Sequence, residues 1–245
     1  MHLAVPSRQT RKPTRSEASH DVPAALLLAL TGLIYNDWLL AFVLPTGLDA
    51  RHSYASELYA SDQPFHTLFA VIELIAAVSV TSGAVWALRR ASGRWSGAGW
   101  WSLIAFGAFS VADVLFPMRC APSVERRCEV VNPMHTTTSA LVHTAIFASM
   151  VLLTVAARRE ADPVPAIRRW GPVILPCALV SAVATVGPLF GWPGWHGVAQ
   201  RVHLLLVGAW LLVVAHALRT RHRREPCTGW SRPGPESRPR TPTHG

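Results

Sequence analysis

Apolar residues occur along this chain in long runs, with most polar residues gathered between them. Amphipathic soluble helices would instead alternate apolar and polar positions with a period near 3.6 residues. Runs of about 20 apolar residues match the length of helix that crosses a hydrocarbon core of roughly 30 Å. The runs cover residues 22–44, 66–88, 98–117, 134–157, 171–190 and 198–218. The pattern therefore predicts an all-α polytopic membrane protein, a bundle of six transmembrane helices.

Composition agrees with this prediction and limits the number of domains. Of the 245 residues, 50% are hydrophobic and 15% are charged, as is typical of integral membrane proteins. Too little sequence lies outside the runs for a separate soluble domain, so we expect one transmembrane domain over residues 22–218. Residues 1–21 and 219–245 are polar and rich in Arg and Pro, and we expect both segments to be disordered tails on the cytoplasmic side.

The distribution of the net charge of +9 indicates orientation rather than nucleic-acid binding. Lys and Arg residues gather beside alternate ends of the apolar runs, and 18 of the 23 lie in segments on the same side as the amino terminus. Cytoplasmic loops of membrane proteins carry such an excess. We therefore expect a multi-pass protein of a bacterial plasma membrane, with both termini cytoplasmic. Its expected partners are membrane lipids, and nucleic acid is not among them.

Ionisable residues interrupt the apolar runs mainly in the half that faces the predicted outer side. With a helical rise of 1.5 Å per residue, Asp37 and Glu73 lie roughly 10 to 13 Å below that surface. A carboxylate at this depth costs several kcal/mol unless it is paired or hydrated, so we expect these groups to face the bundle interior. The predicted polar pocket comprises Asp37, Glu73, Asp113, His135, His143 and His203.

The fourth run carries an unusually polar face. His135 and His143 are eight residues apart, which places them within about 80° of each other around a helix axis, with Ser139 between them. Asn132 and Pro133 precede this run and predict its N-terminal cap.

The first of three interpretations of the pocket is a metal-assisted lipid hydrolase. Zinc or a similar ion would be the cofactor, and it would lower the pKa of a bound water to about 7. Glu73 would act as the general base, and Ser139 is a second candidate catalytic residue. The candidate metal ligands are Asp113, His135, His143 and His203.

Two other interpretations stay open. The same groups could relay protons or ions, as charged groups within membranes often do, although in the inner half only His216 offers a polar group. They could also pair across the bundle and fix helix register, with Asp37 bonded to Asn36 or Tyr35. The leading hypothesis is a lipid-handling or hydrolytic site. The alternative is a non-enzymatic transporter or scaffold, and the sequence does not decide whether the protein is an enzyme.

Two loops on the predicted outer side carry further signals. Residues 46–65 include the segment from Ser53 to Tyr59, which is long enough for two helical turns and would be either a lid or a plain connector. Cys120 and Cys128 flank a short loop between the third and fourth runs. In an oxidising compartment we expect them to form a disulfide, because their spacing matches no zinc signature.

The chain resembles the bacterial multi-pass membrane proteins grouped as domain of unknown function 998. The resemblance rests on Ser53 to Tyr59 with Gln63–Pro64, on Ala112–Asp113 with the segment from Phe116 to Cys120 and Cys128, and on the segment from His135 to His143. It covers roughly residues 27–218 and implies an integral membrane protein without an established activity.

A fainter similarity is to the membrane hydrolases that include alkaline ceramidases and the progestin and adipoQ receptors. In that superfamily a serine, an aspartate and three histidines surround zinc, and Asp113 and the histidines would take those parts here. This chain departs from the pattern, because it has six predicted spans rather than seven. Its last span also lacks two histidines four residues apart, since His203 and His216 are too distant.

Overall fold

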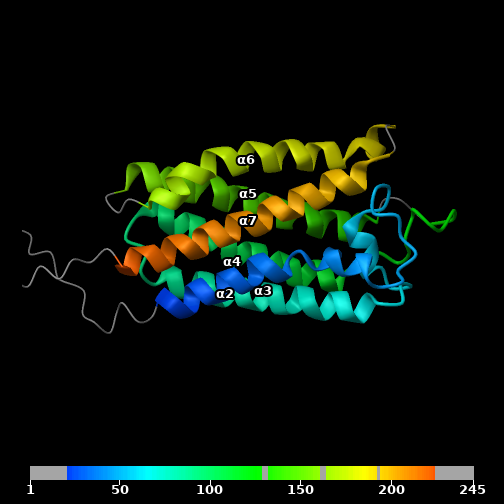
Figure 1. Ribbon diagram of the computed structural model, residues 1–245, viewed down its shortest axis with the longest axis horizontal. Helices are drawn as coiled ribbons and strands as arrows, with labels where there is room; N and C mark the ends of the chain where they lie inside the picture. The colour runs from blue at the N-terminus through cyan, green and yellow to red at the C-terminus, as the bar shows by residue number, and fades with distance from the viewer. Residues whose placement is uncertain (1–20, 129–131, 161–163, 192–193, 224–245) are drawn as a thin grey trace, which may run out of the picture.

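The computed structural model describes residues 21–128, 132–160, 164–191 and 194–223, and these residues form helices and no strand. Six helices among them are long and apolar enough to cross a membrane. They run side by side along the long axis of the molecule (Figure 1). The predicted all-α bundle of six transmembrane helices is confirmed. Most of the predicted disordered tails, residues 1–20 and 224–245, lies outside the described residues.

Most predicted boundaries agree with the helices to within a few residues. The helices are α2 (Asp21–Ile34), α3 (His66–Leu88), α4 (Arg94–Leu115), α5 (Pro133–Arg159), α6 (Pro165–Thr185) and α7 (His196–Arg223), with the short 3-10 helices η1 (Asp37–Phe42), η2 (Ala55–Tyr59) and η3 (Gly187–Phe190). The bounds of α3 are those predicted. Helix α6 begins six residues before the predicted position, because Pro165 suits the first turn of a helix. Helix α7 continues beyond residue 218 into the predicted tail.

The first span is not one continuous helix, and this corrects the prediction for residues 22–44. Helix α2 ends at Ile34, and the span continues as η1. The side chain of Asn36 donates to the Gly32 carbonyl at 3.2 Å and accepts from Trp38 Nε1 at 3.2 Å. Such local bonds compete with the regular helical ladder. The break leaves Asp37 only 7% exposed, inside the bundle.

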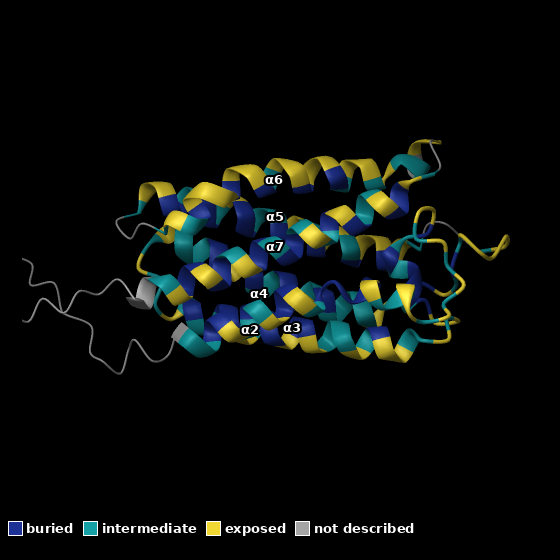
Figure 2. Ribbon diagram, viewed as in Figure 1, coloured by how far each residue is buried: buried dark blue, intermediate teal, exposed yellow. Residues whose placement is uncertain are grey.

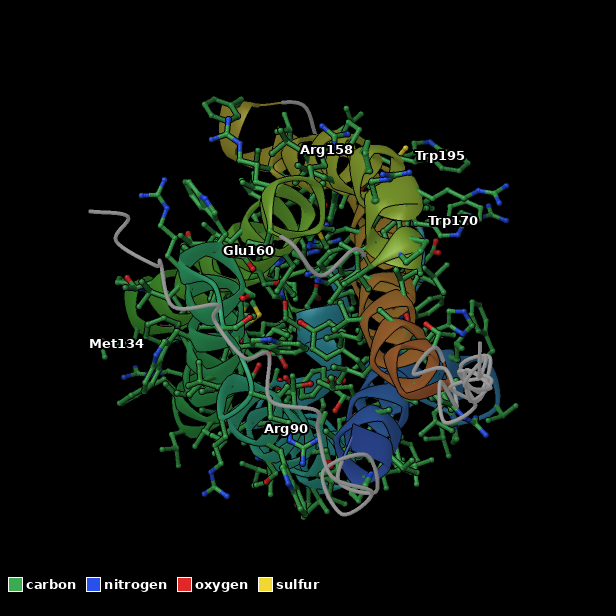
Figure 3. The ribbon with its side chains drawn as sticks, turned by 90° about the vertical axis from the view of Figure 1, so that its left-hand side faces the viewer. Arg90, Met134, Arg158, Glu160, Trp170 and Trp195 are labelled. Carbon is green, nitrogen blue, oxygen red and sulfur yellow. A yellow bond between two sulfur atoms is a disulfide. The ribbon has the colours of Figure 1, made fainter. Side chains whose placement is uncertain are left out.

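The six long helices form a closed ring. Each helix packs against the next one in the sequence, and α7 packs against α2 to close the ring. Of the adjacent pairs, α5 and α6 make the least extensive contact. Figure 3 looks along the bundle, and the blue ribbon of η2 lies at the centre of the ring.

Glycine permits the contact that closes the ring. A Cβ on Gly32 of α2 would lie 2.8 Å from the Gly208 carbonyl oxygen, and a Cβ on Gly208 of α7 would lie 2.6 Å from the Gly32 carbonyl oxygen. Real Cβ atoms do not approach backbone this closely, so the two backbones touch only because neither residue has a side chain. Small residues at helix contacts are common in membrane bundles for this reason.

The two ends of the bundle differ in character. At the end that faces the viewer in Figure 3, Arg90 and Arg158 lie beside the helix ends, and we call this the arginine end. The opposite end, the cap end, carries the loops that contain η2 and the two bonded cysteines. Apolar side chains fill the bundle toward the arginine end, among them Ala84, Leu103 and Leu153. Exposed residues lie along the outward faces of the helices (Figure 2), and many of them are large hydrophobics.

Candidate functional site

The loop that contains η2 folds into the bundle as a cap. Its central residue Glu57 is 1% exposed, and its carboxylate accepts from the Tyr54 backbone N–H at 2.8 Å. The other oxygen accepts from the Ser123 backbone at 3.0 Å and from the Ser123 hydroxyl at 2.5 Å. One buried carboxylate therefore joins two loops that are far apart in the sequence. The segment from Ser53 to Tyr59 covers the bundle interior, so it has the position expected of a lid.

Ser123 lies within a loop closed by the predicted disulfide. Cys120 and Cys128 are bonded at an S–S distance of 1.99 Å, which confirms the predicted pairing. The segment just before this loop holds the cap at a second point, because the Ser61 backbone donates to the Met118 carbonyl at 2.9 Å. The disulfide thus restrains the loop to which the cap is attached.

Helix α7 holds the other side of the cap. Arg201, which is buried, donates from one guanidinium nitrogen to the Ala50 carbonyl at 2.7 Å and to the Ser53 carbonyl at 2.8 Å. One helical turn earlier, Gly197 leaves room for the same loop, because a Cβ there would lie 2.3 Å from the Ser53 carbonyl oxygen. Gln200 accepts from the Ala55 backbone at 2.5 Å.

The cap also reaches the break in the first span. The Tyr59 hydroxyl lies 2.7 Å and 2.8 Å from the two carboxylate oxygens of Asp37. Burial, and then the charge of nearby Asp37, raise the pKa of Tyr59 well above its usual range. Tyr59 therefore remains a hydrogen-bond donor to Asp37 throughout the neutral range. This contact replaces the predicted bond of Asp37 with Asn36 or Tyr35.

Beneath the cap lies a small polar cavity of about 80 Å³, which we call the inner cavity. Its carboxylates are Glu73 of α3 and Asp113 of α4, and its imidazoles include His135 and His143 of α5. The walls contain no Lys or Arg among the described residues. Four of the six predicted pocket residues thus line one cavity. Asp37 and His203 lie behind its walls.

Asp113 is held by hydroxyl groups of α5. Ser139 donates to it, with its oxygen 3.0 Å from each carboxylate oxygen, and Thr138 donates to the same group through a short hydrogen bond. These donors satisfy the carboxylate without a cationic side chain. They also cross-link α4 and α5 near the cap end.

His135 lies next to this cluster. Its Nε2 is 3.4 Å from the Ser139 oxygen, and its Nδ1 is 3.2 Å from an Asp113 oxygen. Ser139, His135 and Asp113 contact one another in the sequence of a Ser-His-Asp triad. The Ser139 hydroxyl, however, donates its one hydrogen to Asp113 and not to His135. His135 Nδ1 has no hydrogen-bond partner among the described residues, because the N–H direction does not meet the nearby carboxylate oxygen. Ser139 therefore positions Asp113.

The two deeper histidines form a stacked pair. The rings of His143 and His203 lie 4.9 Å apart at an angle of 22°. His143 Nδ1 is 2.6 Å from the Ser139 carbonyl, and His203 Nδ1 is 3.0 Å from the Ala178 carbonyl of α6. Each Nδ1 therefore carries the hydrogen. His143 lines the inner cavity, while His203 packs behind it and links α7 to α6.

The candidate metal ligands are distributed over two pairs, Asp113 with His135 and His143 with His203. Within the described ranges, no three His, Cys, Asp or Glu side chains gather as a metal ion would require. The geometry gives no support to the zinc hypothesis, which stays a prediction from the sequence.

A second cavity of about 390 Å³ adjoins the inner one, and we call it the lateral cleft. It lies between α5 and α6, the pair with the least extensive contact. Val183, which is 62% exposed, and Ala140 and Val186, which are also exposed, are among its apolar walls. The two cavities share a wall formed by Ser56, His135, Ser139, His143 and Gln200. A cleft with exposed apolar residues in the membrane-spanning region therefore meets the cavity that contains the carboxylates.

Sequence reasoning missed three residues that hold the cap, Glu57, Gln200 and Arg201. Arg201 is buried although it is a cation close to a predicted helix end. The available signal was their polarity close to predicted helix ends. Polarity near a helix end does not tell a buried residue that anchors the cap from an exposed one, because polar residues of both kinds occur at helix ends.

These features define a multi-pass helical membrane protein with a capped polar cavity. The chain belongs to the family described as "Protein of unknown function (DUF998)", whose model matches residues 23–217. The resemblance inferred from the sequence is thereby confirmed. No curated protein and no solved structure matches the chain.

Proposed function

We propose that the protein binds a membrane lipid, with the polar head of the lipid in the inner cavity and its chain in the lateral cleft. The observation that carries the proposal is the shared wall between a cleft with exposed apolar residues and a smaller cavity that contains carboxylates. A volume of about 390 Å³ for the cleft is within the range of small-molecule sites, roughly 300 to 1,000 Å³. Exposed residues on the walls of the cleft supply a route from the bilayer.

Hydrolysis is not part of the proposal. The Ser139 hydroxyl donates to Asp113, and His135 is not hydrogen-bonded to Asp113 in the way that would orient it as a base. The inner cavity also provides no set of three metal ligands among the described residues. The geometry therefore favours lipid binding over hydrolysis.

A transport path finds no support in the other half of the bundle. The core toward the arginine end is mostly apolar and contains buried hydroxyls such as that of Thr154 but no buried ionisable side chain among the described residues, and His216 is exposed on the outside of α7. A proton or ion relay needs polar groups or water along its whole length.

We further propose that the cap faces the outer side of a bacterial plasma membrane, so that the lipid comes from the outer leaflet. Support comes from the excess of Arg at the opposite end, including Arg89, Arg90, Arg158 and Arg159. A disulfide in the cap-end loop also suits an oxidising compartment.

A blocking substitution tests the binding proposal. Ala140→Phe would fill the lateral cleft from α5, whereas Ala184→Phe on α6 adds the same ring at an exposed position outside both cavities. Native mass spectrometry of the purified protein should show a co-purifying lipid in the wild type and in Ala184→Phe, and loss of most of it in Ala140→Phe. Equal lipid content in the two variants would refute the proposal.

A further inference from the structure

The charge of the inner cavity restricts what head group it can accept. Glu73 and Asp113 both line it, whereas no Lys or Arg among the described residues lines either cavity. Arg201, a buried cation of the cap end, is occupied with backbone carbonyls of the loop above. An anionic phosphate placed here would meet carboxylates without any fixed cation, in a region where charges are weakly screened.

A protonated amine would instead be attracted by the carboxylates of the cavity. Its N–H groups could donate to carboxylate oxygens, which form strong charge-assisted hydrogen bonds. Tyr35 and Tyr59 also line the cavity, and the faces of aromatic rings attract cations. Carboxylates combined with tyrosine rings therefore form a wall suited to an ammonium group.

One imidazole of the cavity lies beside a carboxylate without forming a hydrogen bond to it. His135 is 9% exposed and lines both cavities, and its Nδ1 lies 3.2 Å from an Asp113 oxygen but has no hydrogen-bond partner among the described residues. A buried polar atom normally has a partner, so this nitrogen is a group to which a ligand in the cavity could bond.

Size sets a second restriction. The inner cavity, at about 80 Å³, is the smaller of the two compartments and suits a small head group. The cleft, at about 390 Å³, is the larger compartment and is suited to an alkyl chain.

We propose that the two cavities bind a long-chain lipid whose head is a small protonated amine without phosphate. This inference rests on the proposed lipid-binding function and adds the chemical class of the ligand. Glu73 is the residue that selects for the amine, because it accepts from the single hydroxyl of Ser110, whereas Asp113 already accepts from both Ser139 and Thr138.

Three probes with the same chain test the inference: dodecylamine, dodecanol and dodecyl phosphate. Their binding to the full-length protein in nanodiscs is measured by calorimetry at about pH 9, where buried carboxyl groups are more fully ionised and dodecylamine is still protonated. We expect dodecylamine to bind at least about tenfold more tightly than dodecyl phosphate, with dodecanol between them. Glu73→Gln keeps the shape of the side chain and should lower the affinity for the amine about tenfold while leaving that for the alcohol unchanged.

Asp62→Asn removes an exposed carboxylate outside both cavities and should change nothing. Equal affinity for amine and phosphate, or an amine affinity that Glu73→Gln leaves intact, would overturn the head-group inference. Even if the head-group inference fails, loss of binding of all three probes in Ala140→Phe would still support the proposed lipid-binding function. If no probe binds, or if binding is insensitive to Ala140→Phe, both proposals fail.

Discussion

The hydroxyl of Tyr59 lies within 2.8 Å of both carboxylate oxygens of Asp37, and this contact ties the cap to the first membrane span. Tyr59 comes from a loop, and Asp37 sits where α2 gives way to η1. Burial of the Asp37 carboxylate without a hydrogen-bond donor would cost free energy. The cap supplies that donor through Tyr59.

Tyr59→Phe should destabilise the protein by about 1–3 kcal/mol, because it leaves the Asp37 carboxylate buried without its donor. Thermal unfolding in detergent measures the effect. Tyr54→Phe is the matched control, since the Tyr54 hydroxyl makes only a 3.4 Å contact with the Thr185 carbonyl. A loss of stability no larger than that of the control would contradict the importance of the bond.

The same tyrosine predicts a loss of stability in alkaline solution. Burial and Asp37 raise the pKa of Tyr59 in the folded protein, whereas in the unfolded chain it titrates near its ordinary value of about 10. Above pH 10 or so the unfolded state binds fewer protons than the folded state, so stability is complete below this pH and falls as pH rises. Unfolding midpoints measured across this range should fall more steeply in the wild type than in Tyr59→Phe. Parallel curves would rule out the contribution.

Glu57→Gln should loosen the cap. The amide keeps one acceptor for the Tyr54 backbone but presents N–H groups to Ser123, whose backbone and hydroxyl both donate there now. Bonds to a charged acceptor contribute about 1.5–3 kcal/mol. Hydrogen exchange of residues 53–59 should therefore become faster. Glu125→Gln, an exposed change in the disulfide loop, should leave this exchange slow, and fast exchange in both variants would argue against a specific role for Glu57.

Removing the disulfide should weaken the same attachment. A Cys120→Ser, Cys128→Ser double variant is expected to lose roughly 2–3 kcal/mol, as for the opening of a short loop. Because Ser123 lies inside that loop, combining this variant with Glu57→Gln should cost less than the two changes separately. Fully additive losses of unfolding free energy would show that the disulfide and Glu57 act independently.

Gly208→Ala should separate α2 from α7. The new Cβ would lie 2.6 Å from the Gly32 carbonyl oxygen and 2.4 Å from the Asn36 amide nitrogen, and overpacking of this kind costs about 1–3 kcal/mol. Gly97→Ala is the contrasting change, because nothing lies within 4 Å of a Cβ there and alanine favours a helix. Thermal unfolding should show a loss for the first variant and no loss for the second. The opposite order would exclude a close contact at Gly208.

Sequence reasoning located helices better than it located contacts. The bounds of α3 were predicted to the residue, because a polar loop with Pro64 precedes it and Arg89 and Arg90 follow it. The break at Asn36 was missed, because average hydropathy does not detect one side chain that bonds to its own backbone. Helical rise gives the depth of a residue directly, so Asp37 and Glu73 were placed at a common level.

The direction of side chains could not be predicted in the same way. His135 and Ser139 share a face of α5, but their meeting with Asp113 depends on how α4 and α5 are rotated against each other. That rotation is set by packing along the whole contact. His203, predicted to line the pocket, instead lies behind His143 because its ring bonds to the Ala178 carbonyl.

The glycine contact between α2 and α7 makes the order of the spans circular, since the first and last helices are neighbours like any consecutive pair. A chain that starts at α4, runs through α7 and a linker into α2, and ends with α3 would keep every neighbour in the ring. Both new ends would emerge beside Arg89 and Arg90, so a circular permutant is an architecture this bundle can accommodate.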